Sequence, residues 1–181
     1  ANDEQSRTMY GVFQSAMRKW QGSADAIGVH VTDPSEKPFV DRFDVSRAPM
    51  PLVLALAPNG AITKGFPIRF DEEQLRGAFV SPCTAKCLKC LQDRKLVLLC
   101  VHNERTPFRQ AAMRGVLQFK ADARYADATE VLTLDPNDPA EAALLNELKV
   151  SPRTAQAVTV LLAPPGSPVA TFVGAVTKDQ I

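Results

Sequence analysis

The sequence has little excess charge, few histidines and no long apolar run, and each of these absences excludes a class of protein. Its 21 Lys and Arg residues nearly balance 20 Asp and Glu residues, so the charge favours neither nucleic acid nor an anionic membrane as a partner. No apolar run approaches the roughly 20 residues that a membrane-spanning helix needs. The two histidines form no metal-binding pair, and no phosphate loop or nucleophile elbow is present. What remains, 45% apolar and 23% charged residues, is typical of a soluble globular protein.

Cysteine is also sparse. Four cysteines in 181 residues are too few for a disulfide-dense scaffold.

The chain begins at Ala1 without a methionine, so we expect that a leader or more of the protein has been removed. Export to a bacterial periplasm would account for such a start.

What the sequence does contain is an internal repeat. Residues 32–73 and 134–178 match in order: an Asp-Pro pair (Asp33-Pro34 and Asp135-Pro136) precedes a Leu-Ala-Pro run that ends in glycine at Gly60 and Gly166. Upstream, Met17-Arg18 matches Met113-Arg114, so the two copies are separated by about a hundred residues throughout. One supersecondary unit has therefore been used twice, and a repeat of that length favours two domains. We place the first at 1–80, a cysteine-bearing linker helix at 81–93 and the second at 94–181.

The second copy predicts the order β-α-β-α-β-β, with a final helix beginning at Thr177. Its first strand is a short, continuous apolar run, which is typical of a strand buried on both faces. Asp and Pro residues mark helix starts, and Pro and Gly mark a hairpin. The predicted elements are a strand at 95–101, a helix from Thr106-Pro107, a strand at 130–134, a helix at 139–148 and strands at 157–162 and 169–173.

The first copy predicts the same order without its opening strand. Residues 1–8 are too polar to form a central strand. Asn59-Gly60 predicts a hairpin turn, and Asp71 predicts the N-cap of a closing helix. The predicted elements are a helix at 9–20, a strand at 26–31, a helix at 35–43 and hairpin strands at 52–57 and 61–65.

This order of elements resembles the thioredoxin family, most strongly over 150–181. The resemblance implies an α/β fold of two thioredoxin-like βαβ-ββα units in tandem, the first lacking its opening strand. The family carries a Cys-x-x-Cys after the first strand, where this chain has Cys100 and then His102 without a second cysteine. The family's cis-proline corresponds to Pro51 in the first copy and to Ala157 in the second. The resemblance therefore extends to the fold and not to the active-site dithiol.

Three of the four cysteines lie together between the two copies. Ser81 and Pro82 predict a helix start, and helical offsets of four and seven residues place Cys83, Cys87 and Cys90 on one face. Cys83, nearest the helix start, is expected to be the most acidic of the three.

Three interpretations of this cluster remain open. Soft sulfur ligands select copper or zinc, with Cys83, Cys87, Cys90 and Cys100 as the ligands if the helix packs beside the following strand. Alternatively, the thiols are an inert apolar stripe of a buried helix, because cysteine behaves as a small hydrophobe. The third interpretation is a disulfide or thiol switch.

We therefore expect a non-catalytic tandem thioredoxin-like binding or scaffold protein that binds copper or zinc through its cysteine-lined helix. The alternative is a thiol–disulfide redox enzyme or redox sensor that uses Cys83, Cys87 and Cys90. A third interpretation is a fragment whose catalytic strand lies upstream. The expected partner is another protein, and the cysteine helix is also a candidate surface for a homo-oligomer.

Overall fold

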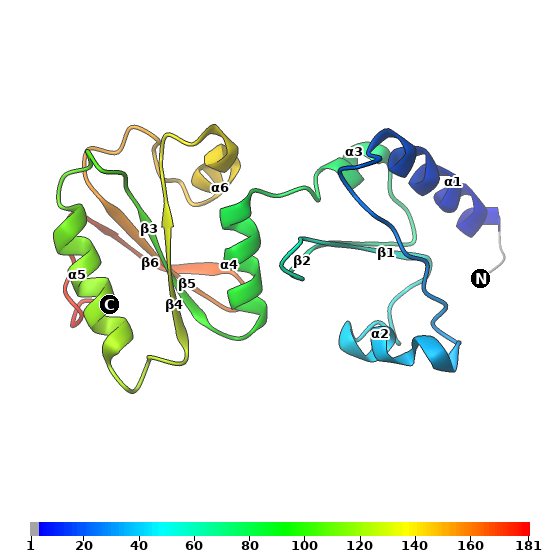
Figure 1. The fold of residues 1–181 in the computed structure, drawn as a ribbon, viewed down its shortest axis with the longest axis horizontal. Helices are drawn as coiled ribbons and strands as arrows, with labels where there is room; N and C mark the ends of the chain where they lie inside the picture. Colours follow the sequence, from blue (N-terminus) through cyan, green and yellow to red (C-terminus); the bar gives the residue numbers. More distant parts are fainter. Residues whose placement is uncertain (1–3) are drawn as a thin grey trace. The chain divides into compact units, whose positions relative to one another are not determined.

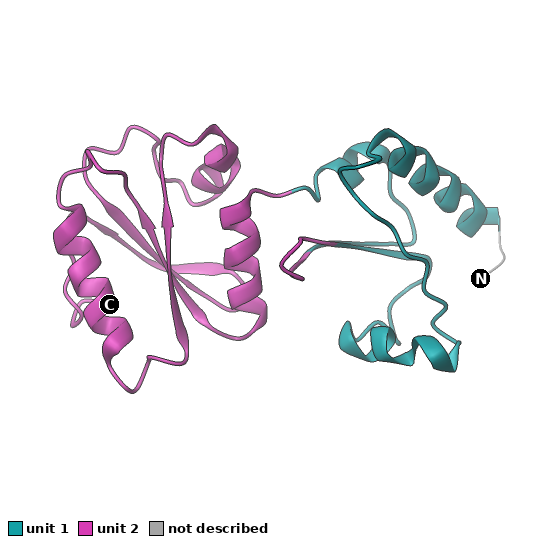
Figure 2. Ribbon diagram, viewed as in Figure 1, with its two compact units in different colours: residues 1–55, 63–79 teal, residues 56–62, 80–181 magenta. Residues whose placement is uncertain are grey.

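The computed structural model describes residues 4–181, which form two units of mixed α/β structure. Unit 1 takes the chain through residue 55 together with 63–79, and unit 2 takes 56–62 and 80–181 (Figure 2). Unit 2 holds a four-stranded sheet, and a two-stranded sheet is built from the hairpin at 52–67. Among the described residues no helix is long and apolar enough to cross a membrane.

The sheet of unit 2 is built around a central strand, β3 (Leu96–Val101). It runs parallel to β4 (Thr129–Leu134) and antiparallel to β5 (Val158–Ala163), and β5 pairs with β6 (Ser167–Val173), which gives the order β4-β3-β5-β6 (Figure 1). The predicted strands of the second copy are confirmed to within about two residues, the usual uncertainty of strand and helix ends.

Helices cover both faces of this sheet (Figure 1). Helices α4 (Pro82–Gln92) and α6 (Ala142–Glu147) pack on one face, and α5 (Arg109–Ala121) packs on the other. Side chains of β3 alternate between the two layers: Val97, Leu99 and Val101 contact the α4 side, and Leu98 and Cys100 contact the α5 side. Burial on both faces explains why β3 is a continuous apolar run in the sequence.

Helix α5 lies directly against the end of the chain. A Cβ atom placed on Gly115 would be 1.8 Å from the backbone carbonyl oxygen of Val176, so only glycine fits at that point of the helix. The helix predicted from Thr177 is not formed, and residues 178–180 make a turn. In that turn the Thr177 N–H donates to Oε1 of Gln180 at 2.8 Å.

Unit 1 packs α1 (Glu4–Lys19) and α3 (Glu72–Arg76) against one face of the hairpin formed by β1 (Leu52–Leu56) and β2 (Ile62–Pro67). Its buried cluster joins Ala16 of α1 to apolar residues of the hairpin and α3: Phe66, Phe70, Leu75 and Ala78. A 3-10 turn, η1 (Pro34–Glu36), leads into α2 (Lys37–Arg42). The predicted hairpin is confirmed, as is the Asp71 cap, which accepts from the Gln74 N–H at 2.7 Å.

The strand predicted at 26–31 is wrong. These residues have no regular secondary structure, and all six are exposed. Alternating apolar residues favour a strand only where a neighbouring strand accepts its hydrogen bonds. No described strand lies beside this segment.

A capping hydrogen bond of unit 1 has a counterpart in unit 2. The Ser35 N–H donates to Asp33 at 2.8 Å, and the Ala140 N–H donates to Asp138 at 2.9 Å. Each Asp precedes a proline that opens a 3-10 turn, η1 in unit 1 and η2 (Pro139–Glu141) in unit 2. Asp33 therefore corresponds to Asp138 rather than to Asp135, the residue matched from sequence.

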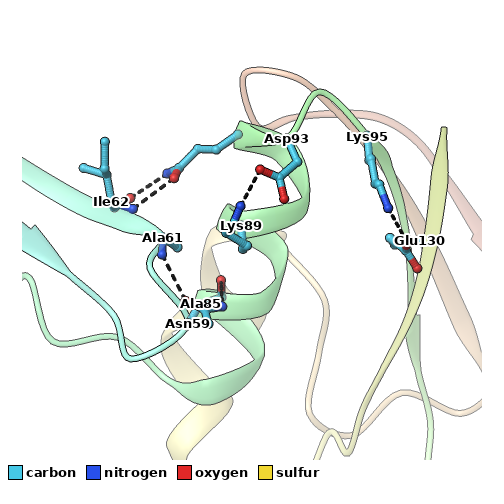
Figure 3. A network of polar contacts seen from close by, with 9 residues as sticks. Asn59, Ala61, Ile62, Ala85, Lys89, Asp93, Lys95 and Glu130 are labelled. Atoms are coloured by element: carbon cyan, nitrogen blue, oxygen red, sulfur yellow. Dashed lines mark hydrogen bonds and ion pairs between the residues drawn. The ribbon is translucent and has the colours of Figure 1, made fainter. Parts of the chain in front are cut away.

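The hairpin tip at 56–62, which groups with unit 2, is hydrogen-bonded to α4 (Figure 3). The Asn59 side-chain amide donates to the carbonyl oxygen of Ala85 at 2.8 Å. The Gln92 side-chain amide makes two bonds to the backbone of Ile62, accepting from its N–H at 2.9 Å and donating to its carbonyl at 2.7 Å. One glutamine side chain thus satisfies both backbone groups of Ile62, as a neighbouring strand would.

Candidate functional site

The candidate site lies at the first turn of α4, where the sequence placed the cysteine helix. The predicted helix start is confirmed: the Ser81 side chain accepts from the Thr84 N–H at 3.1 Å, and Pro82 occupies the first turn. An N-cap hydroxyl of this kind satisfies one of the N–H groups that have no partner within the helix. The cap fixes where the helix begins and so which way its cysteines face.

Three cysteines share the face of α4 that packs on the sheet. Cys83 and Cys87 are 9% and 3% exposed and belong to the cluster that contains Leu91 and Val97, with the half-buried Cys90 packed against it. All four cysteines of the chain are free thiols. The prediction that Cys83, Cys87 and Cys90 lie on one face is confirmed.

Cys83 and Cys87 lie one helical turn apart on α4, and each changes the pKa of the other. The hydrogen bond from Cys87 is the largest cause that holds the pKa of the Cys83 thiol below its ordinary value, and it acts against burial and the charge of Glu141. The same bond, together with burial, raises the pKa of Cys87. Burial is also the main cause that raises the pKa of Cys90. Of the three, Cys83 is the one whose environment favours the thiolate.

A buried carboxylate completes the end of the helix. Glu141, 5% exposed and at the end of η2, accepts from the Ser81 hydroxyl at 2.5 Å and from the Cys83 backbone N–H at 3.1 Å. A carboxylate is favoured there because the helix dipole and the free N–H groups present positive charge. A segment 58 residues away from Cys83 in sequence thus holds the cysteine-bearing turn in place.

Cys83 also lines a pocket of about 390 Å³. One wall is the first turn of α4, with Cys83 and the exposed Lys86, and the other is β4 and the loop after it. The acidic residues of the lining are Asp135, Asp138 and Glu141. Cys87 is not part of the lining. A small molecule in the pocket would therefore meet one thiol, one ammonium group and three carboxylates.

Cys100, the fourth predicted metal ligand, lies on the opposite face of the sheet. It packs with Ala112 and Val116 of α5, and burial raises its pKa to about 11. The structure brings Cys83, Cys87 and Cys90 together on α4, whereas the Cys100 side chain faces the other side of the sheet. Over residues 4–181 no group of three or more His, Cys, Asp or Glu side chains has the arrangement of a metal site. Binding of copper or zinc by the cysteines of α4 stays a prediction.

His102 follows β3, near the loops at the carboxyl ends of the parallel strands. Its Nε2 is buried without a hydrogen-bond partner among the described residues. Burial, followed by the charge of Arg109, lowers its pKa. Both effects favour the neutral ring, and Cys83 is not among the groups that perturb it.

Comparisons with models of protein families, with curated proteins and with solved structures find no match to this chain.

Glu141 is the residue of the site that sequence analysis missed. Its matching residue in the repeat is Glu36, which lies two residues after the Asp33-Pro34 pair that the sequence analysis named. An alignment with Asp138-Pro139-Ala140-Glu141 would have located Glu141. Nothing in the local sequence signals that this carboxylate reaches the start of α4, because its partners are distant along the chain.

Proposed function

We propose that this chain is a thiol-based redox sensor carried on a tandem thioredoxin-like scaffold, and that Cys83 is the reactive group. The observation that carries the proposal is the position of Cys83 in the first turn of α4, where Cys87 is the largest cause that lowers its pKa. A thiolate, not a thiol, attacks disulfides, and a positive helix end together with a hydrogen-bond donor stabilises it. The matched hydrogen bonds of the two units and the sheet order of unit 2 support the scaffold.

The reaction that fits this site is exchange with a small disulfide, R–S–S–R. The Cys83 thiolate attacks one sulfur, a Cys83–S–S–R bond forms, and the second half leaves as R–S⁻, which is protonated by solvent. The disulfide supplies the oxidising equivalents, so no other oxidant is required. A free thiol, R–SH, reverses the reaction and restores Cys83.

The pocket favours a small disulfide whose halves carry both signs of charge. Lys86 on one wall complements a carboxylate of R, and Asp135 and Asp138 on the other complement an ammonium group. Opposite charges on opposite walls orient such a molecule relative to Cys83, whereas a molecule of only one sign meets repulsion on one side.

A single-thiol switch fits this geometry better than a dithiol enzyme. Cβ atoms one helical turn apart are separated by about 5–6 Å, whereas a disulfide needs Cβ atoms about 3.5–4.5 Å apart. A Cys83–Cys87 bridge therefore requires the first turn of α4 to unwind. Cys87 acts as a hydrogen-bond donor to Cys83 and not as a resolving cysteine.

The position of Cys100 weighs against the soft-metal scaffold as the leading function. A structural zinc site is closed by four ligands, and α4 presents two buried thiols and one half-buried thiol on a single helix. Over the described residues, no further His, Cys, Asp or Glu side chain joins these thiols in the arrangement of a metal site. A redox sensor needs only Cys83 and Cys87, which both lie on α4.

The test is the pH dependence of Cys83 alkylation in the full chain. Iodoacetamide rates are followed by intact mass and peptide mapping in wild type, Cys87→Ala and Cys87→Ser. Cys87→Ala removes a hydrogen bond to a charged group, worth about 1.5 kcal/mol, so we expect the pKa of Cys83 to rise by about one unit and its rate at neutral pH to fall about tenfold. Cys87→Ser restores most of the rate, because a hydroxyl also donates.

A second measurement tests the disulfide itself. We expect cystine, which carries both charges, to form a mixed disulfide with Cys83 faster than the uncharged hydroxyethyl disulfide does. Lys86→Ala removes that preference. The proposal is wrong if Cys83 of the folded chain titrates at or above the ordinary cysteine value and forms no mixed disulfide.

A further inference from the structure

The outer edge of β4 forms one wall of the pocket that contains Cys83. In the four-stranded sheet β4 is an edge strand, because β3 is its only strand neighbour among the described residues. The pocket is lined by the consecutive residues 131–135 together with the first turn of α4. Successive side chains of a strand point to opposite faces, so a lining of consecutive residues means that the pocket follows the edge of the strand.

The pairing of β4 with β3 shows which backbone groups lie on this edge. The carbonyls of Ala128 and Leu134 accept hydrogen bonds from N–H groups at the two ends of β3, at 2.7 and 3.0 Å. Alternate residues of a strand direct their N–H and carbonyl groups to the same side. Val131 and Thr133 therefore direct theirs away from β3, and both residues line the pocket. An extended peptide would satisfy these two donors and two acceptors.

The start of the same edge is already closed by a side chain. The ammonium group of Lys120 on α5 donates to the carbonyl of Ala126 at 3.2 Å and to the carbonyl of Thr129. Thr129 is the first residue of β4 and faces outward like Val131 and Thr133. The open part of the edge is therefore the part beside the pocket.

Side chains on this edge alternate between the two faces of the sheet. Leu132 and Leu134 face the α4 side, in the cluster that contains Cys83. Directly opposite residues of paired strands point their side chains to the same face. A cysteine opposite Leu132 would therefore have its sulfur on the face where Cys83 lies. Residues two positions before and after that cysteine share the same face.

The charges of the lining follow an order along β4. Helix α4 leads into β3 through residues 93–95, so it runs opposite to β3 and to β4, which is parallel to β3. Asp135 and Asp138 follow the end of β4. Lys86 lies about one helical turn beyond Cys83, toward the start of β4. A segment antiparallel to β4 thus brings a basic residue to the two aspartates and, four positions later, an acidic residue to Lys86.

We propose that the β4 edge binds an extended segment of a disulfide-bearing polypeptide, antiparallel to β4, and presents its disulfide to Cys83. The segment has a basic residue, a half-cystine two positions later and an acidic residue two positions after that. The residues between them pair with Thr133 and Val131 through main-chain hydrogen bonds. Opposite charges at the two ends fix the direction of the segment.

This inference rests on the proposed function and names its substrate. The Cys83 thiolate attacks the sulfur of the half-cystine, and a disulfide bond between Cys83 and the segment forms. The other half of the original disulfide leaves as a thiolate, which solvent protonates. The disulfide of the segment is the oxidant, so the step needs no other one.

The test is the rate at which the full chain reacts with three capped peptides whose cysteine carries thionitrobenzoate as a disulfide. The first is Lys-Val-Cys-Val-Glu, the second has the two charges exchanged, and the third is the first with both valines N-methylated. Release of the coloured thionitrobenzoate thiolate gives the rate, and intact mass identifies the peptide bound to Cys83. We expect the first peptide to react about tenfold faster than the third, because N-methylation removes two main-chain donors. It should also react faster than the second.

Three variants of the chain locate the site. Lys86→Ala should remove the difference between the two charge orders. Lys89→Ala, on the same helix but outside the lining, should keep that difference. Thr133→Pro removes an outward N–H without removing a hydrogen bond to β3, and we expect it to reduce the difference between the first peptide and its N-methylated form. Circular dichroism verifies that each variant folds.

The inference is overturned if the N-methylated or charge-exchanged peptide reacts as fast as the first. Slow hydrogen exchange at Val131 and Thr133 without peptide would also overturn it, because another segment would already pair with the edge. The reaction with cystine separates this inference from the proposed function. If cystine forms a mixed disulfide with Cys83 while the three peptides react alike, the inference fails and the proposed function stands. If neither cystine nor any peptide reacts, both fail.

Discussion

Ile68 and Gly174 occupy matching positions in the two units and make the same hydrogen bond. The Ile68 N–H donates to the carbonyl of Pro51 and the Gly174 N–H to that of Ala157, each at 2.7 Å. Both residues are left-handed, with φ of 67° and 84°. Glycine adopts this conformation freely, whereas a β-branched residue does so rarely. The turn after the hairpin is thus the same in both units, although only one has the residue that suits it.

Gly174→Ala is expected to destabilise the protein by about 1–2 kcal/mol. A left-handed φ costs a residue with a Cβ about that much, and the new Cβ would lie 2.5 Å from Oε1 of Gln156. Urea unfolding measures the change. Gly28→Ala is the control, because a Cβ there meets nothing within 4 Å, and we expect it to lie within about 0.5 kcal/mol of wild type. Equal effects of the two substitutions would contradict the prediction.

Glu141→Gln is expected to make Cys83 more acidic while destabilising α4. The charge of Glu141 raises the pKa of Cys83, so its removal lowers that pKa and increases the thiolate fraction at pH 7. The free energy of unfolding falls by about 1–3 kcal/mol, because the part-buried Ser81 hydroxyl and the buried Cys83 N–H lose a charged acceptor. Alkylation rates measured against pH check the lower pKa of Cys83, and urea unfolding checks the loss of stability. The control is Glu147→Gln on the exposed side of α6, which should change neither the pKa of Cys83 nor the free energy of unfolding. A higher pKa for Cys83 in Glu141→Gln would refute the argument.

Cys100 is expected to resist alkylation in the folded chain. Its pKa of about 11 keeps it protonated at pH 8, and it is 1% exposed. Peptide mapping after brief iodoacetamide treatment should find label on Cys83 and little on Cys100, and treatment in urea should label both. Rapid native labelling of Cys100 would show that its place in the core is wrong.

Soft-metal binding, if measured, is expected to depend on α4 alone. Titration with Cu(I) or Zn²⁺ under reducing conditions should lose its tight phase in Cys83→Ser and Cys87→Ser. Cys100→Ala should leave that phase unchanged, because Cys100 faces α5. Loss of binding in Cys100→Ala, with folding verified by circular dichroism, would restore the four-cysteine site.

Features set by neighbours in sequence were predictable, and features set by distant partners were not. Ser81 and Pro82 fixed the start of α4, and the apolar run of β3 identified a central strand. The same kind of pattern failed at 26–31, because a strand exists only beside another strand and none lies there. Within the site, helical spacing placed the three thiols correctly. Helical spacing could not show that Glu141 contacts α4, because Glu141 is distant from α4 in sequence. It also could not show that Cys100 faces α5 on the other side of the sheet.

The contact between Gly115 and Val176 means that the long helices of the two units are not interchangeable. In the register that aligns Met17 with Met113, the residue of α1 that matches Gly115 is Lys19. A graft of α1 in place of α5 would drive a lysine side chain into the backbone that glycine leaves free. The terminal segment and α5 must therefore be transplanted as a pair in any chimera, because each is shaped to the other.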